Sequence, residues 1–176
     1  MSQTPNLSED TRNSILAAAR DDTGRKLAAE DYLGASFSAA HLLVLARQAT
    51  WTSHEQEKML DALAEEARVQ LDAGNENRAA WRFAYMRLLG CTTLPFDSES
   101  LAQAVLPAGR DWTRIAQVGR AADFYLLTRE APWTEEELSE MLSTVERDLQ
   151  GQLTSNDSVM AADRLALFDI LASSLG

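Results

Sequence analysis

The chain aligns with itself without a gap when it is shifted by 82 residues. Residues 39–90 lie over residues 121–172, with 17 identities in 52 aligned positions. The pattern Trp-Thr-x-x-Glu falls at the same place in both segments, starting at Trp51 and at Trp133. Because self-similarity at a fixed spacing is typical of repeated supersecondary units, we predict one domain built from two similar halves, residues 1–92 and 93–176.

The composition predicts that the repeated unit is helical. The 176 residues include 28 Ala and 25 Leu, but only 6 Val and 3 Ile. Ala and Leu favour helix, whereas strands are enriched in β-branched residues. A chain of this length buries about 70% of its unfolded surface, so it needs no disulfide or metal to hold a core. We therefore predict an all-α bundle or repeat of about eight to nine helices.

Turn and capping signals divide the chain into expected helices. The first covers about residues 8–20 and is expected to stop at the Asp-Asp-Thr-Gly sequence at 21–24. A weaker helical stretch follows over about 26–33 and is expected to break at Gly34. The segment 91–97, which contains Pro95, is the expected linker between the halves. The remaining helices are expected over about 38–49, 53–73, 77–89, 98–106, 110–128, 135–153 and 158–173.

Most repeated residues have a structural interpretation. Thr52 with Glu55, and Thr134 with Glu137, have the spacing of a capping box, in which two side chains satisfy free N–H groups at a helix start. In the helix expected after each box, apolar residues recur at steps of three, four and four, which indicates a core-facing stripe. The two stripes are Leu60, Leu63, Ala67 and Leu71, and Leu142, Val145, Leu149 and Leu153.

Three polar residues lie inside mostly apolar helical segments. Arg82 and Arg164 are a repeated charged pair, and we expect each to form a buried or half-buried ion pair. His41 lies in the run Ala-Ala-His-Leu-Leu, and we expect a hydrogen-bonded histidine of the core.

The residue types that carry catalytic chemistry are few and scattered. The chain has two histidines and a single cysteine, Cys91, so no intrachain disulfide or cysteine-based metal cluster is expected. His54 lacks the second histidine of a zinc-protease helix. The sequence also lacks Glu-x-x-His pairs, Gly-rich phosphate loops and the G-x-S-x-G pattern. We therefore expect no enzyme activity, no catalytic residues, no bound metal and no cofactor.

The net charge excludes two classes of partner. With 27 acidic and 16 basic residues, the formal charge is −11. Such a surface repels nucleic acid and anionic lipid head groups. The first ten residues lack the apolar region of a signal peptide, and no apolar run reaches the roughly 18 residues of a membrane span. We expect a cytoplasmic protein that binds neither nucleic acid nor membrane.

Two surfaces are candidates for binding a partner. On the helix expected over 135–153, Glu136 and Glu140 lie four residues apart on the solvent side, and Glu146 adds a further charge. The second candidate lies on the helix expected over 77–89 and contains residue types that are enriched in interface hot spots. Burial of this helix is the alternative interpretation. The second set consists of Arg78, Trp81, Arg82 and Tyr85.

These features favour a non-enzymatic, acidic helical-repeat protein that binds another protein through a basic contact surface. An adaptor, a secretion chaperone or an immunity-type protein fits this description. One alternative is an acidic inhibitor that occupies the nucleic-acid-binding cleft of its target. Another is a helical bundle that binds or converts a small ligand in a pocket between the halves. The partner's identity, the pathway and the formation of homo-oligomers are left open by the sequence.

Overall fold

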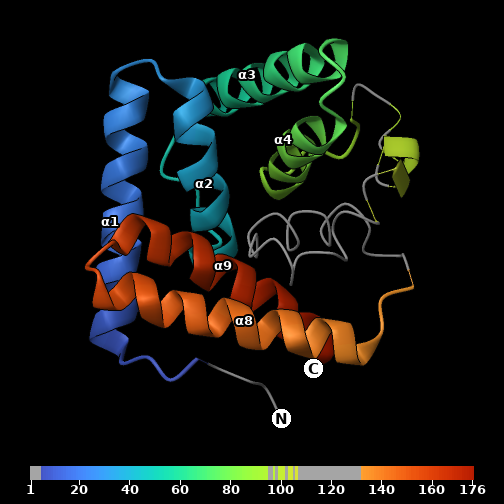
Figure 1. Cartoon of the computed structure of the whole chain (residues 1–176). Helices are drawn as coiled ribbons and strands as arrows, with labels where there is room; N and C mark the ends of the chain where they lie inside the picture. Colours follow the sequence, from blue (N-terminus) through green and yellow to red (C-terminus); the bar gives the residue numbers. More distant parts are fainter. Residues whose placement is uncertain (1–4, 95–96, 98, 102, 105, 107–131) are drawn as a thin grey trace. The chain divides into compact units, whose positions relative to one another are not determined.

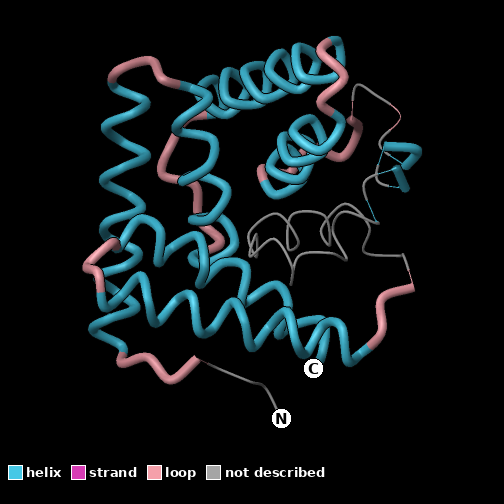
Figure 2. The backbone as a smooth tube through the Cα atoms, viewed as in Figure 1, coloured by secondary structure: helices cyan, strands magenta, loops and turns pink. Residues whose placement is uncertain are grey.

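The computed structural model describes residues 5–94, 97, 99–101, 103, 104, 106 and 132–176 (Figure 1). In this part of the chain, helices are joined by turns and no strand is present (Figure 2). The predicted all-α class is therefore confirmed, whereas the count of eight to nine helices is not. The helix predicted over 110–128 lies outside the described residues. The helices are α1 (Glu9–Ala28), α2 (Tyr32–Ala46), α3 (Ser53–Asp72), α4 (Glu76–Leu88), α8 (Glu135–Thr154) and α9 (Ser158–Leu175).

The chain divides into two compact units, each described here by itself. Unit 1 combines Met1–Thr50 with Thr134–Gly176, and unit 2 is Trp51–Trp133. Unit 1 therefore contains α1, α2, α8 and α9, while unit 2 contains α3 and α4. The proposed division into the halves 1–92 and 93–176 stays a prediction.

Unit 1 brings the first and last helices of the chain together. Helix α9 packs against α1, α2 and α8, and α1 also packs against α2 (Figure 1). The facing surfaces are rich in alanine, which lets helix axes approach closely, with larger side chains such as Phe168 and Leu42 filling the space between them. The fully buried face of α9 consists of Ala161, Ala162, Leu165, Ala166, Leu167, Phe168 and Leu171.

In unit 2, α3 and α4 pack against each other. A chain of two hydrogen bonds connects the start of α3 to the end of α4. The Trp51 Nε1–H donates to Gln56 Oε1 at 2.7 Å, and Gln56 Nε2 donates to the Leu89 carbonyl at 2.6 Å. Trp51 is buried, so this indole N–H is satisfied without access to water.

Helix α1 continues through residues 21–24, where the sequence predicted its end, so that prediction is wrong. The polar groups that suggested a turn are satisfied within the folded unit. Thr23 donates to the Ala19 carbonyl at 2.8 Å, and the buried Asp22 carboxylate accepts from Ser38 Oγ. Gly24 stays helical because nothing in its surroundings requires a left-handed conformation there.

The expected break at Gly34 is also wrong, because Gly34 lies in the first turn of α2. The real break is at Glu30, which adopts a left-handed φ of 55°. Asp31 then caps α2, accepting from the Gly34 N–H at 2.9 Å. The two short segments expected over 26–33 and 38–49 therefore become the end of α1 and the single helix α2.

The three described helix pairs have the same connection. Helices α1, α3 and α8 each contain 20 residues, and the next helix begins four positions after each one ends. The residue midway is left-handed in every case: Glu30 (φ 55°), Gly74 (φ 75°) and Asn156 (φ 59°). Its N–H donates to the carbonyl three residues back, and the next N–H donates five residues back. These are Schellman motifs, which satisfy carbonyls at the helix end.

The three helix pairs also bury equivalent positions. The first helices of the pairs bury Ile15, Ala19 and Thr23; Met59, Leu63 and Ala67; and Met141, Val145 and Leu149. In α3 and α8 the buried stripe thus starts one position before the predicted Leu60 and Leu142, although Leu142 is buried as well. The second helices bury residues 35, 36 and 39–42; residues 79, 80 and 83–86; and residues 161, 162 and 165–168. The spacing is 44 residues from the first pair to the second and 82 from the second to the third.

Candidate functional site

An acidic residue occupies the same position in each helix pair and contacts a residue 16 positions later. In α3 and α4, Arg82 Nη2 lies 3.5 Å from Glu66 Oε1. In α8 and α9, the Arg164 guanidinium pairs with the Asp148 carboxylate. Both arginine side chains are 16% exposed, which confirms the predicted half-buried ion pairs. In α1 and α2 the pair is Asp22 and Ser38.

In α1 and α2 a serine stands where the other two helix pairs have an arginine. The positive charge near Asp22 comes instead from residues of α1, the helix that also carries this aspartate. Lys26 Nζ lies 2.8 Å from Asp22 Oδ2, and Arg25 Nη2 lies 3.1 Å from Oδ1. Burial raises the pKa of Asp22, but the hydrogen bonds from Lys26 and Ser38 and the nearby charges outweigh it. The net result is a pKa below the ordinary value of an aspartate.

Unit 1 contains a larger cluster of charged groups, which joins three helices. His41 of α2 is 7% exposed, and its Nε2 lies 2.8 Å from Asp163 Oδ1 of α9. This contact joins α2 to α9 within unit 1. Arg164 contacts both the second oxygen of Asp163 and the Asp148 carboxylate of α8. The expected core position of His41 is confirmed.

The cluster keeps Asp163 ionised. Burial alone raises the pKa of Asp163, but the charge and hydrogen bonding of His41, followed by the charge of Arg164, lower it. The lowering effects prevail, so the pKa lies below the ordinary value of an aspartate. The Asp163 carboxylate thus remains charged because its contacts with His41 and with the Arg164 guanidinium outweigh the effect of burial.

The aromatic and basic set on α4 is largely used inside unit 2. Tyr85 is buried at 6% exposure, and Arg82 pairs with Glu66. The Arg82 guanidinium also lies 5.5 Å from the centroid of the half-buried Trp81 ring. Arg78 is the exposed member of the set. This arrangement favours the structural interpretation of the four residues, and their role in binding stays a prediction.

The acidic candidate surface is confined to the solvent side of α8. Glu136 and Glu140 are exposed, and Glu146 is half-buried at the margin of this side. No ion pair in the described part of the chain engages these three residues. Arg147 is also exposed and lies seven residues after Glu140, hence on the same side of the helix. The role of Glu136, Glu140 and Glu146 in binding stays a prediction.

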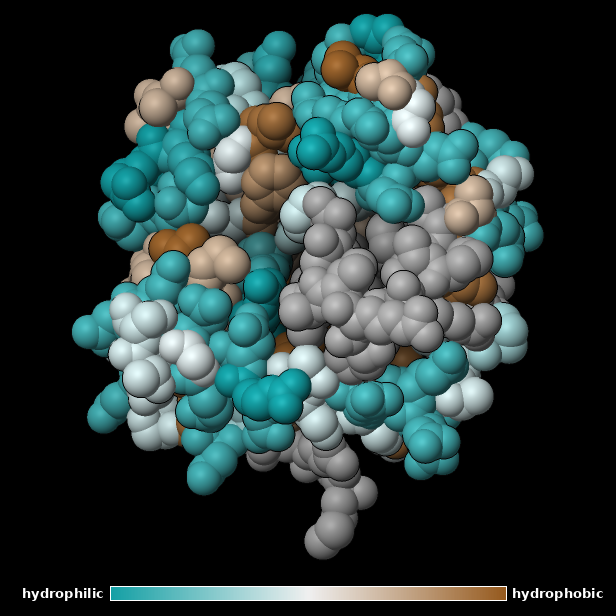
Figure 3. Space-filling view, viewed as in Figure 1, coloured by the Kyte–Doolittle hydropathy of each residue, from teal (hydrophilic) through white to brown (hydrophobic). Residues whose placement is uncertain are grey.

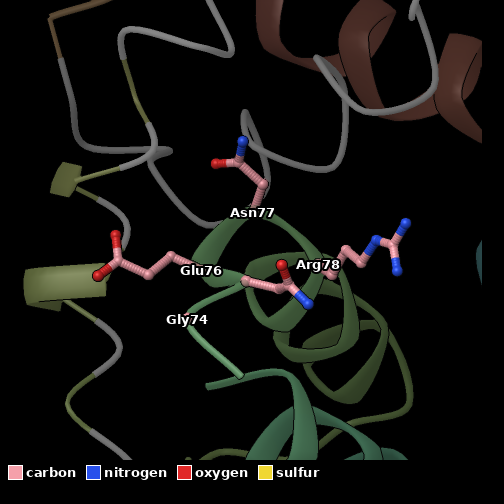
Figure 4. Close-up of a pocket in the computed structure, with 5 residues that line it drawn as sticks. Gly74, Glu76, Asn77 and Arg78 are labelled. Atoms are coloured by element: carbon pink, nitrogen blue, oxygen red, sulfur yellow. The ribbon is translucent and has the colours of Figure 1, made fainter. Parts of the chain in front are cut away.

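Two shallow hollows lie in the described surface, and both are lined mainly by polar groups. One surrounds the turn between α3 and α4, where Glu76 and Arg78 extend in opposite directions (Figure 4). The other lies in unit 1, where residues 6–8 and the start of α1 meet the turn between α8 and α9. Hydrophilic side chains cover most of the described surface that is visible in Figure 3. The pocket expected between the halves stays a prediction.

The sequence analysis missed the roles of the acidic residues of α9. Asp163 contacts His41, and Asp169 Oδ2 lies 2.9 Å from Arg12 Nη2 of α1. A signal was present, because His41 and Asp163 are both polar residues within helices that are rich in apolar side chains. Buried groups of this kind need partners, which makes each a candidate partner for the other.

Three further observations bear on function. Within the described residues, no helix has the length and apolar character that a bilayer span requires. No three His, Cys, Asp or Glu side chains of this part of the chain are grouped so that they could hold a metal ion. Comparisons of the chain with protein families, with curated proteins and with solved structures gave no match.

Proposed function

We propose that this protein is a non-enzymatic array of helical hairpins that binds another protein with a basic contact surface. The observation that carries the proposal is the common framework of the three described hairpins. They share the length of the first helix, the connection, the buried positions and the contact of an acid with the residue 16 positions later. Arrays of such units present extended surfaces for partner proteins.

The framework supports a repeat of hairpins within the proposed duplicated halves. Helices α3 and α8 start 82 residues apart, and so do α4 and α9, in agreement with the spacing of the sequence repeat. The pair α1 and α2 adds a hairpin that sequence identity did not reveal. Because residues 107–131 lie outside the described part, the full duplication remains our proposal.

The exposed acids of α8 are the proposed contact region. Glu136 and Glu140 are four residues apart, and like charges at this spacing cost a few tenths of a kcal/mol. Neither is needed for the capping box, which uses Glu137 and Thr134. Complementary charge would raise the association rate of a basic partner more than it would strengthen the final complex.

The test compares two variants with the same change in net charge. Glu136→Lys with Glu140→Lys reverses the proposed surface, and Glu57→Lys with Asp61→Lys reverses two exposed acids on α3. The partner is first captured from native lysate and identified, and association rates are then measured at low ionic strength. We expect a severalfold slower rate for the α8 variant, a smaller effect for the α3 variant, and a rate that falls with added salt.

Equal rates for wild type and the α8 variant would exclude this surface. Arg78→Glu would then test the exposed member of the α4 set in the same assay. Glu146 is left unchanged in these variants because it is half-buried, and a lysine there would risk disturbing the contact of α8 with α9.

A further inference from the structure

Residue identity across the three described hairpins is limited to five positions, and none of them is exposed. The first helices share two leucines, while the second helices and their C-terminal ends share two alanines and a leucine. These sets are Leu16, Leu60 and Leu142; Leu27, Leu71 and Leu153; Ala35, Ala79 and Ala161; Ala40, Ala84 and Ala166; and Leu45, Leu89 and Leu171. Identity is therefore retained where side chains pack within the hairpins.

The outer faces of the first helices show the opposite relationship. Nine equivalent positions are exposed in α1, α3 and α8, and at none of them do all three helices carry the same residue. In α1 these positions, which define the outer face, are 9, 10, 13, 14, 17, 21, 24, 25 and 28, and the equivalent residues lie 44 positions later in α3 and 126 positions later in α8. The three helices thus present the same face to solvent with different side chains.

The second helices offer a partner little accessible surface. No residue of α2 is exposed, and this helix packs against both α1 and α9 (Figure 1). The exposed residues of α9 are confined to its ends, at Met160, Ser173 and Ser174. Those of α4 are likewise confined to residues 76–78 and Arg87. A partner that binds along the helices therefore meets the side chains of the first helices.

In unit 1, the outer faces of α1 and α8 carry the same charge. Each has three acidic residues and one basic residue at its nine positions. On α1 the net negative charge comes from Glu9 and Asp10 in the first turn, because the third acid pairs with Arg25 of the same face. The equivalent two positions are also acidic in α8, at Glu135 and Glu136. Both faces therefore suit a partner whose contact surface is basic.

We propose that the basic partner contacts both first helices of unit 1, α1 as well as α8, through their outer faces, while α2 and α9 hold these helices in place. This second contact region rests on the proposed function, since it is assigned to the same partner. A change of charge on the outer face of α1 should then alter association in the same direction as the equivalent change on α8.

Ser14 provides a test in which charge is added rather than removed. This exposed serine of α1 occupies the position that Glu140 has in α8. Ser14→Glu therefore places an acid four residues after Asp10, and Ser14→Lys places the opposite charge there. The matched controls are Ser173→Glu and Ser173→Lys, because Ser173 is an exposed serine of α9 that lies four residues after Asp169.

Association is measured at low ionic strength with a fluorescently labelled helical peptide whose lysines lie four residues apart, a defined probe with a basic surface. We expect Ser14→Glu to associate roughly twofold faster than wild type and Ser14→Lys roughly twofold slower. The two Ser173 variants should differ from wild type by less, because a charge on α9 acts only at a distance. Circular dichroism and thermal unfolding check that all four variants fold like wild type.

Two outcomes separate the contact on α1 from the proposed function. Ser14 variants that behave like the Ser173 variants, while Glu136→Lys with Glu140→Lys still slows association of the peptide, would overturn the contact on α1 and leave the proposed function standing. An α8 variant that associates as fast as wild type would instead overturn the proposed contact region of α8.

Discussion

Arg82 and Arg164 occupy equivalent positions in two helical hairpins, and each pairs with an acidic residue 16 positions earlier. The acids are Glu66 and Asp148, which are themselves 82 residues apart. Arg164 has an additional partner, the buried Asp163, whereas Glu66 also accepts a hydrogen bond from Gln70 at 2.9 Å. The equivalent arginines Arg82 and Arg164 therefore contribute differently to the stability of their two hairpins.

This difference predicts unequal costs of removing the two arginines. Arg164→Met leaves two carboxylates without their guanidinium, one of them buried, and should lower the free energy of unfolding by about 3 kcal/mol. Arg82→Met leaves Glu66, which is 27% exposed and keeps its bond from Gln70, and should cost about 1 kcal/mol. Urea unfolding at pH 7 measures both. Equal costs would show that Asp163 does not depend on Arg164.

The two capping boxes predict that removal of either N-cap threonine lowers the free energy of unfolding by a similar amount. Both are present in the structure: the Thr52 and Thr134 hydroxyls accept from the N–H three residues on, and the Glu55 and Glu137 carboxylates accept in return. Thr52→Ala and Thr134→Ala should each cost about 1 kcal/mol, the usual effect of losing an N-cap. Ser143→Ala, at an exposed position within α8, is the control and should be neutral or slightly stabilising. Thermal unfolding provides the comparison, and partner binding should be unaffected.

At the left-handed residues of the three connections, some substitutions should raise the free energy of unfolding and others should lower it. Glu30→Gly should raise the free energy of unfolding by about 1 kcal/mol, because a non-glycine residue at this φ is strained. Asn156→Gly should gain less, since asparagine tolerates the left-handed region better. Gly74→Ala should lose about 1 kcal/mol from backbone strain alone, because a Cβ at this position meets no neighbouring atom. Chemical unfolding at neutral pH tests all three, and a stabilising Gly74→Ala would contradict the assignment.

The buried aspartates predict a loss of stability in acid. Asp22 and Asp163 both have a pKa below the ordinary value, so each contributes stability above the pKa of the unfolded chain, near 3.8. That contribution is lost as the pH falls through the lower pKa of the folded state. In Asp22→Asn, stability should therefore decline less steeply below pH 4, and at pH 7 it should be about 1 kcal/mol lower. Circular dichroism during acid titration compares the unfolding of Asp22→Asn with that of wild type. The same loss of structure below pH 4 in both proteins would refute the prediction.

Features encoded by neighbouring residues were accessible from the sequence. Composition indicated the helical class, and the four-residue pattern of the capping box placed the starts of α3 and α8 correctly. The repeat spacing also located the two half-buried arginines. These features depend on interactions within a few turns of one helix, so their signals are present in short stretches of sequence.

Tertiary structure decided what local signals could not. Helix α1 passes through a sequence that is typical of a turn, because Ser38 of the next helix satisfies the Asp22 carboxylate. The α1–α2 hairpin matches the others in buried positions rather than in residue identity. The contact of His41 with Asp163 joins positions 122 residues apart, and no local pattern identifies such a partner. Helical propensity and capping act over one or two turns, whereas the burial of a charge is settled only when distant helices pack together.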